Sequence, residues 1–210
     1  QRIKTGLYHV NMARTRTPVS DAGAEPSDVR QRILDTASTL FYERGVRAVG
    51  VDLVVDESGV AKTSLYRHFR TKDDLIVAFL EREDAEFWSQ WDDVAARHAG
   101  NPTAQLEAHI RWIGKRLARA NYRGCPQINV AAEFAEADHP SRAVSREHMQ
   151  AMRKRLAELA RELGAARPGE LAAQLGVLVN GAFVSASLLS PDEATRVLLG
   201  AARALVTASR

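Results

Sequence analysis

Apolar residues recur every three or four positions along most of the chain, and this spacing predicts helices rather than strands. The first predicted helix covers residues 28–44, with Ser27 as a candidate N-cap and Gly45 as the stop signal. Its apolar positions lie one turn apart and can face a core: Ile33, Leu34, Ala37, Leu40 and Phe41. The N-terminal part of the chain therefore begins its folded region with an amphipathic helix.

Two short helical segments follow, at residues 51–58 and about 61–69, with Gly59 between them. Two short helices joined at a glycine have the outline of a helix-turn-helix. Thr71 can cap a longer helix that runs to about residue 98. The spacing thus predicts a compact group of three helices followed by a long one.

Prolines mark the starts of the remaining helices, predicted at residues 102–120, 126–137, 140–164, 168–189 and 191–208. Alternating patterns typical of strands are scarce, so the predicted fold class is all-α. Residues 171–191 carry no charge and approach the length of a membrane span, but polar residues and glycines interrupt them. We expect this segment to pack between layers of protein, with no membrane as a partner.

Composition narrows the class of protein. The chain has 210 residues, a formal net charge of +3 and one cysteine, so a disulfide framework and a multi-cysteine zinc site are excluded. Residues 1–10 show no secretory signal, and we expect a cytoplasmic protein. Residues 1–26 are predicted to form a flexible arm, of which residues 1–11 precede a plausible start at Met12. Arg14 and Arg16 can enter a DNA minor groove or belong to a solvated tail.

The basic segment 58–72 carries the candidate chemistry. It contains four Lys or Arg residues and no acidic residue, while Val60, Leu65 and Phe69 fall on one helical face. The predicted outward side chains are suited to base edges and phosphates: Lys62, Thr63, Ser64, Tyr66, Arg67 and His68. Lys72 follows the cap at Thr71, where backbone N–H groups also favour a phosphate. On charge alone, a solvated basic face is the better explanation of the segment.

The order of these residues resembles the TetR family of bacterial transcriptional regulators. The match covers about residues 30–80: Arg30-Gln31-Arg32-Ile33-Leu34-Asp35-Thr36-Ala37, Leu40-Phe41, Gly45, and the string from Gly59 to Lys72 with Leu65-Tyr66-Arg67-His68-Phe69. The resemblance implies a helix-turn-helix DNA-binding domain at residues 27–72 and a ligand-binding and dimerisation domain at residues 73–210. It also implies a homodimer that binds double-stranded DNA at a pseudo-palindrome and represses until a small molecule releases it.

Carried over position by position, the resemblance assigns base reading to Lys62, Thr63 and Ser64, and phosphate contacts to Tyr66, Arg67, His68 and Lys72. This chain departs from the family at Gly50, where a Ser or Thr cap is usual, and at Asp52, where a basic or polar residue is frequent. Asp52 either reads a base or forms a salt bridge with Lys62 or Arg47. These departures also leave open a helical interaction module that has lost DNA binding.

The C-terminal two-thirds has nearly balanced charge and should serve another purpose. Candidate residues for an effector pocket are Trp88, Trp91, His109, Trp112, Cys125, Asn129, Phe134, Met149 and Met152. Cys125, which precedes a helix start, is either a sensor thiol with a lowered pKa or a buried structural thiol. The residues predicted to form a dimeric four-helix bundle are Leu171, Leu175, Leu178, Ala182, Leu189, Val197, Leu198, Ala201 and Leu205.

An enzyme is the main rival class, and the sequence gives it little support. The chain lacks a Gly-x-Ser-x-Gly elbow, a phosphate-binding glycine loop and a His-Glu-x-x-His motif. The adjacent pairs Asp138-His139 and Glu147-His148 place their side chains on different helical faces, whereas two metal ligands on one face lie four residues apart. We therefore expect no catalytic residues, no metal and no cofactor.

Overall fold

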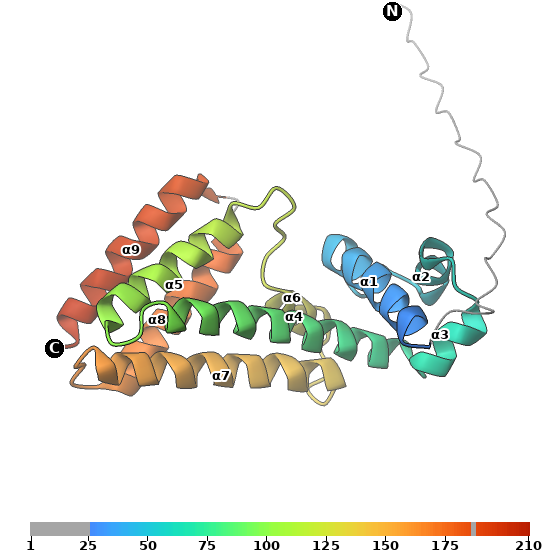
Figure 1. Ribbon diagram of the computed structural model, residues 1–210, viewed down its shortest axis with the longest axis horizontal. Coiled ribbons are helices and arrows are strands. Elements are labelled where there is room, and N and C mark those ends of the chain that lie inside the picture. Colours follow the sequence, from blue (N-terminus) through green and yellow to red (C-terminus); the bar gives the residue numbers. More distant parts are fainter. Residues whose placement is uncertain (1–25, 186–187) are drawn as a thin grey trace, which may run out of the picture.

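The computed structural model describes residues 26–185 and 188–210, and they fold into helices with connecting turns (Figure 1). The predicted arm, with Met12, Arg14 and Arg16, lies outside the described residues. The described helices are α1 (Pro26–Arg44), α2 (Val51–Ser58), α3 (Lys62–His68), α4 (Lys72–Ala96), α5 (Pro102–Leu117), α6 (Pro126–Glu133), α7 (Pro140–Glu162), α8 (Pro168–Ser185) and α9 (Pro191–Ala208). The predicted all-α class is confirmed.

Helices α1, α2 and α3 pack with the first part of α4 around one hydrophobic cluster. Fully buried side chains from each element meet there, among them Ile33, Val54, Leu65 and Phe79. Gly59 ends α2 with φ of 66°, a left-handed conformation that favours glycine. Helix α1 begins at Pro26, so Ser27 lies within its first turn and the predicted N-cap at that residue is wrong.

Helix α4 belongs to both parts of the molecule. Its 25 residues start at a capping box, in which Thr71 Oγ1 accepts from the Asp74 N–H and the Asp74 carboxylate accepts from the Thr71 N–H. The first turns bury Leu75 and Phe79 in the N-terminal cluster, whereas Trp91 and its neighbours lie in a second cluster. The helix therefore connects the two clusters (Figure 1).

The second cluster is formed by α5, α7, α8 and α9 around the far half of α4. Three of the predicted helices extend too far at their C-terminal ends, because α5 ends at Leu117, α6 at Glu133 and α8 at Ser185. None of the described helices is long and apolar enough to cross a membrane. Leu171 and Leu175 are fully buried in this second cluster.

Candidate nucleic-acid interface

Helix α3 turns one face into the core and the other to solvent. Val60, Leu65 and Phe69 anchor it, each at most 3% exposed. Lys62 and Thr63, in its first turn, are exposed, in agreement with the prediction. Ser64 is only 8% exposed, so its predicted place on the outer surface is wrong. Within α3 it is buried together with Leu65.

The first residue of α3 is paired with an acidic side chain of α2. Lys62 Nζ lies 2.5 Å from Asp52 Oδ1, and the two side chains are 54% and 77% exposed. The hydrogen bond and the charge of Asp52 raise the pKa of Lys62, which keeps it cationic. Of the two salt-bridge partners considered for Asp52, the structure selects Lys62. Gly50, the unusual cap, makes no side-chain hydrogen bond and leaves α2 intact.

The predicted phosphate-binding residues lie at the end of α3 and the start of α4. Tyr66 and Arg67 are exposed, and Tyr66 is among the large hydrophobic side chains at the surface. His68 is half-buried, and its Nε2 is enclosed without a partner. Lys72 opens α4, and partial burial lowers its pKa. An ammonium that is already partly dehydrated loses less on binding a phosphate beside the helix N-terminus.

A carboxylate from α6 holds the turn between α1 and α2. Glu133 Oε2 accepts from the Arg47 N–H at 2.8 Å, and Oε1 accepts from the Val46 N–H at 3.2 Å. Arg47 Nη1 in turn donates to the Glu133 carbonyl at 2.9 Å. The close approach needs Gly45, because a Cβ there would lie 3.0 Å from Glu133 Oε1. Sequence reasoning missed Glu133, which lies 86 residues from Arg47 and belongs to no motif.

A second contact joins the same two regions. Tyr42 on α1 donates its hydroxyl hydrogen to the Gly124 carbonyl at 3.3 Å, and the Arg123 N–H donates to the Tyr42 oxygen at 3.0 Å. Gly124 precedes α6, and Glu133 ends it. Contacts at both ends of α6 therefore reach α1 and the α1–α2 turn, and α1 packs against α3.

The structure disperses the predicted pocket residues. Trp91 and Met152 are buried in the second cluster, and the buried His109 ring stacks 3.8 Å from that of Trp91. Trp88 and Trp112 pack against the edge of the cluster. The remaining residues have separate environments: Asn129 is exposed and bonds to the Arg123 carbonyl, Phe134 stacks on His139, and Met149 accepts from Asn180. Most of the predicted residues therefore serve packing.

A small cavity of about 20 Å³ lies between α4, α5, α6, α7 and α8. Of the predicted residues, only Cys125 lines it, together with Glu83, Phe87, Arg116, Tyr122, Gly124, Pro126, Gln127, His148 and Phe183. Burial raises the pKa of Glu83 and lowers that of Arg116. A wider groove of about 320 Å³ adjoins the cavity and reaches α1, and Glu83, Arg116 and Tyr122 line both.

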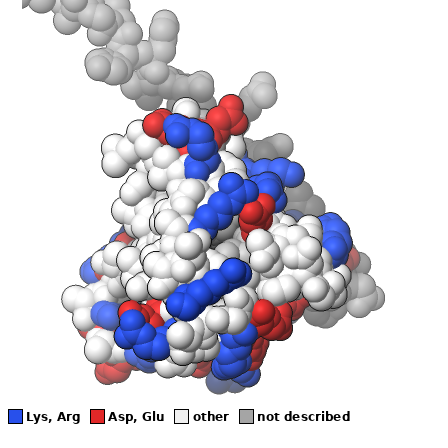
Figure 2. All heavy atoms as spheres, turned by 90° about the vertical axis from the view of Figure 1, so that its left-hand side faces the viewer, with Lys and Arg blue, Asp and Glu red and all other residues white. Residues whose placement is uncertain are grey.

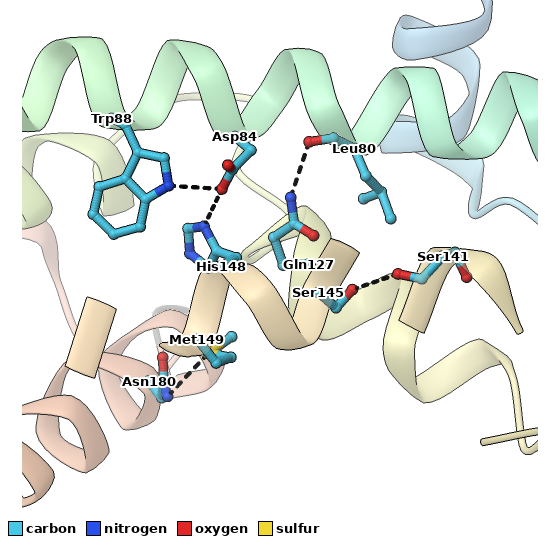
Figure 3. A network of polar contacts seen from close by, with 9 residues as sticks. All are labelled: Leu80, Asp84, Trp88, Gln127, Ser141, Ser145, His148, Met149 and Asn180. Atoms are coloured by element: carbon cyan, nitrogen blue, oxygen red, sulfur yellow. Dashed lines mark hydrogen bonds and ion pairs between the residues drawn. The ribbon is translucent and has the colours of Figure 1, made fainter. Parts of the chain in front are cut away.

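Polar contacts fix two of the lining residues (Figure 3). His148 Nδ1 lies 2.6 Å from Asp84 Oδ1, which also accepts from Trp88 Nε1 at 2.8 Å. Gln127 Nε2 donates to the Leu80 carbonyl at 3.0 Å, while its Oε1 is buried without a partner. A buried acceptor without a partner is costly and is a reason to expect a donor in the cavity.

Cys125 is a buried thiol of the structural kind. Burial raises its pKa, although the N–H groups of residues 127 and 128 act in the opposite direction. The prediction of a lowered pKa is therefore wrong, because desolvation outweighs the helix N-terminus here. Within the described ranges, no group of three or more His, Cys, Asp and Glu side chains could hold a metal ion.

Exposed apolar side chains lie on α8, just after its end and on α9, and among them only Val197 was a predicted interface residue. Val177, Val184 and Leu188 are 73%, 70% and 80% exposed, and Val197 of α9 is 44% exposed. Among the predicted interface residues, Leu171, Leu175 and Leu198 are buried in the subunit core, so their assignment is wrong, whereas Leu178, Ala182, Leu189, Ala201 and Leu205 are half-buried. Figure 2 views the end of the molecule away from α3, where basic and acidic side chains alternate with uncharged areas.

Comparison with known proteins gives a consistent result. Residues 33–79 match the family model described as bacterial regulatory proteins, tetR family. The transcriptional repressor KstR2 of Rhodococcus jostii is 33% identical over 93 residues, 44% of this chain and 45% of that protein. The transcriptional activator FasR of Mycolicibacterium smegmatis is 43% identical over 58 residues, 27% of this chain and 26% of that protein. The chain thus spans less than half the length of these two relatives.

Solved structures extend the similarity to most of the chain. SCO4454, a TetR-family transcriptional regulator from Streptomyces coelicolor, superposes with a TM-score of 0.83 at 28% identity, over 87% of this chain and 96% of that one. The reduced form of NemR from Escherichia coli shares the fold, with a TM-score of 0.75 at 22% identity, over 84% of this chain and 96% of that one. These named relatives are transcriptional regulators rather than enzymes.

Proposed function

Because the chain belongs to the TetR family of bacterial regulatory proteins, we propose that it is a ligand-responsive transcriptional regulator that binds operator DNA as a homodimer. The observation that carries this proposal is the exposed face of α3, with Lys62, Thr63, Tyr66 and Arg67 on a helix anchored by buried apolar residues. Such a role is regulatory rather than catalytic, and it requires the protein to act in the cytoplasm, where bacterial DNA lies.

In the proposed complex, the start of α3 enters the major groove. Lys62 and Thr63 then face base edges, since N-terminal residues of a recognition helix make the base contacts. Tyr66, Arg67 and Lys72 hold phosphates on either side, and those contacts set the register without reading sequence. His68 contributes through its Nδ1, because its Nε2 is enclosed. Ser64 has no role in this arrangement.

Dimerisation is proposed to use the exposed apolar face of α8 and α9. Val177 and Val184 are exposed seven residues apart on α8, Leu188 is exposed after the end of that helix, and Val197 is exposed on α9. Large apolar side chains left exposed on two helices that pack together support a protein contact. Two copies joined there would present two α3 helices, as a pseudo-palindromic operator requires.

The effector is proposed to enter the cavity beside Gln127 from the adjoining groove. A cavity of about 20 Å³ holds a water molecule, so a larger ligand must displace lining side chains such as Tyr122. Helix α6 connects this event to DNA binding, because Gln127 in its first turn lines the cavity and Glu133 at its end holds the α1–α2 turn. Helix α4 provides a second route.

Repression is the proposed direction of regulation, with release by the effector. KstR2 is a repressor, and its similarity covers 93 residues of this chain. FasR is an activator, so the direction is settled by a reporter assay rather than by similarity. Deleting the gene should raise transcription from the operator-bearing promoter, and a fall would indicate an activator.

The test of DNA binding is the salt dependence of affinity, measured by fluorescence anisotropy on an operator duplex. Each lost phosphate contact should lower the slope of log K against log salt by about 1, so Lys72→Gln in both subunits should lower it by about 2. The matched control is Lys154→Gln, which removes an exposed lysine of α7 far from α3. Equal effects of the two substitutions would overturn the assignment, and no binding at any salt would favour the interaction-module alternative.

A further inference from the structure

The ion pair between Lys62 and Asp52 places a hydrogen-bond donor and an acceptor side by side at the start of α3. The two paired atoms, Lys62 Nζ and Asp52 Oδ1, are 2.5 Å apart and come from different helices. Both side chains are more than half exposed. The pair therefore presents a donor and an acceptor together to whatever contacts this end of the helix.

The two helices fix the direction of this pair. Lys62 is the first residue of α3, and Asp52 is the second residue of α2. Helix α2 is anchored by Val54 and α3 by Leu65, which are at most 1% exposed. The pair consequently has a defined order, with the acceptor on the α2 side and the donor on the α3 side.

The edge of a base pair in the major groove has the complementary arrangement. In G·C, guanine offers the O6 acceptor and cytosine the N4 donor, and these two atoms are hydrogen-bonded to each other at about 2.9 Å. Lysine can donate to O6 while aspartate accepts the second N4 hydrogen. T·A offers the same order through O4 and N6, but G·C adds the N7 acceptor for lysine. In C·G and A·T the order is reversed.

We propose that Lys62 and Asp52 act as one unit that reads the orientation of a single base pair, with a keto base facing Lys62 and an amino base facing Asp52. G·C is the preferred pair in each half-site. This inference rests on the proposed DNA-binding function and names what the site selects. It also explains why an acidic residue lies beside DNA. At a G·C pair the Asp52 carboxylate accepts a hydrogen bond from the cytosine amino group, whereas at a C·G pair it faces the guanine O6 acceptor.

The intramolecular ion pair does not oppose this role. A solvent-exposed pair contributes little to stability, so its atoms can adjust toward a base pair at small cost. Without DNA, the pair holds both side chains in place, which reduces the freedom that each must lose on binding. At phosphates, by contrast, Asp52 repels the backbone and lowers affinity for unrelated sequences.

The test is selection of bound duplexes from a random pool by the full chain and by variants. For the wild-type protein, one position in each half-site should prefer G·C over C·G on the order of tenfold. The exchanged variant Asp52→Lys with Lys62→Glu reverses the order of donor and acceptor. It should invert the preference at that one position and leave the other positions unchanged.

The single substitutions Asp52→Asn and Lys62→Met provide the second measurement. Each should reduce the orientation preference at that position several-fold, and thermal unfolding should remain unchanged because both residues are exposed. If all variants retain the wild-type preferences, or lose affinity for all sequences alike, the orientation-reading inference is overturned while DNA binding stands. If the wild-type protein selects no sequence, the proposed function fails as well.

Discussion

Removing the Glu133 carboxylate should loosen the α1–α2 turn and detach it from α6. Glu133→Gln keeps the size of the side chain, but its amide has one acceptor oxygen and presents N–H groups to the second backbone donor. A hydrogen bond to a charged group contributes about 1.5–3 kcal/mol net, and these two are partly exposed. We expect a loss of about 2 kcal/mol, which corresponds to about 4–8 °C in Tm for a chain of this size.

Hydrogen exchange at the Val46 and Arg47 amides measures the local effect, and calorimetry gives the change in Tm. Both amides should exchange faster in Glu133→Gln, because one of the two acceptor oxygens is replaced by an NH2 group and the other loses its negative charge. Glu136→Gln is the matched control, since it removes an exposed carboxylate a few residues further along the chain. Unchanged exchange at both amides, with Tm within a degree of wild type, would refute the assignment of Glu133 as the contact that holds the turn.

Three further predictions concern the interior of the C-terminal part. Burial lowers the pKa of His109 from 6.5 to about 4. As the pH falls, this histidine is therefore protonated in the unfolded chain before it is protonated in the folded protein. The free energy of unfolding should decrease by up to about 3 kcal/mol as the pH is lowered from about 6.5 to 4. His109→Leu should flatten that part of the curve in unfolding titrations, and an unchanged slope would contradict this origin. Gly114→Ala places a Cβ 2.0 Å from Thr195 Oγ1 and should cost about 1–3 kcal/mol, partly restored by Thr195→Ala, whereas Gly200→Ala meets open space. Equal Tm values for Gly114→Ala and Gly200→Ala would count against close α5–α9 packing. Cys125 should react with a thiol reagent far more slowly in the folded protein than in denaturant, and similar rates would contradict its burial.

The sequence was sufficient to predict the elements that local signals define. Proline starts, the glycine turn at Gly59 and the Thr71 cap act within a few residues, so most helices were placed within about two residues of their starts. The exposure of Lys62 and Thr63 followed from the period of α3. Ser64 was misplaced because one position corresponds to about 100° around a helix, so a residue beside Leu65 lies at the boundary of the buried face.

Other features depend on tertiary contacts that spacing alone does not contain. Helix α8 is apolar on several faces, so periodicity could not tell the face toward the subunit core, with Leu171 and Leu175, from the exposed face with Val177 and Val184. The contact between Glu133 and the Arg47 turn joins residues 86 apart. The pocket prediction relied on residue type, and aromatic side chains such as Trp91 serve packing more often than ligand binding.

Selection of duplexes from a random pool at near-physiological salt is the decisive experiment for a dimeric DNA-binding regulator. We expect enrichment of a pseudo-palindrome whose half-sites are centred about one turn of DNA apart, roughly 34–36 Å or a multiple of it. A pool that remains random after repeated rounds would contradict it and would leave a helical interaction module as the better description.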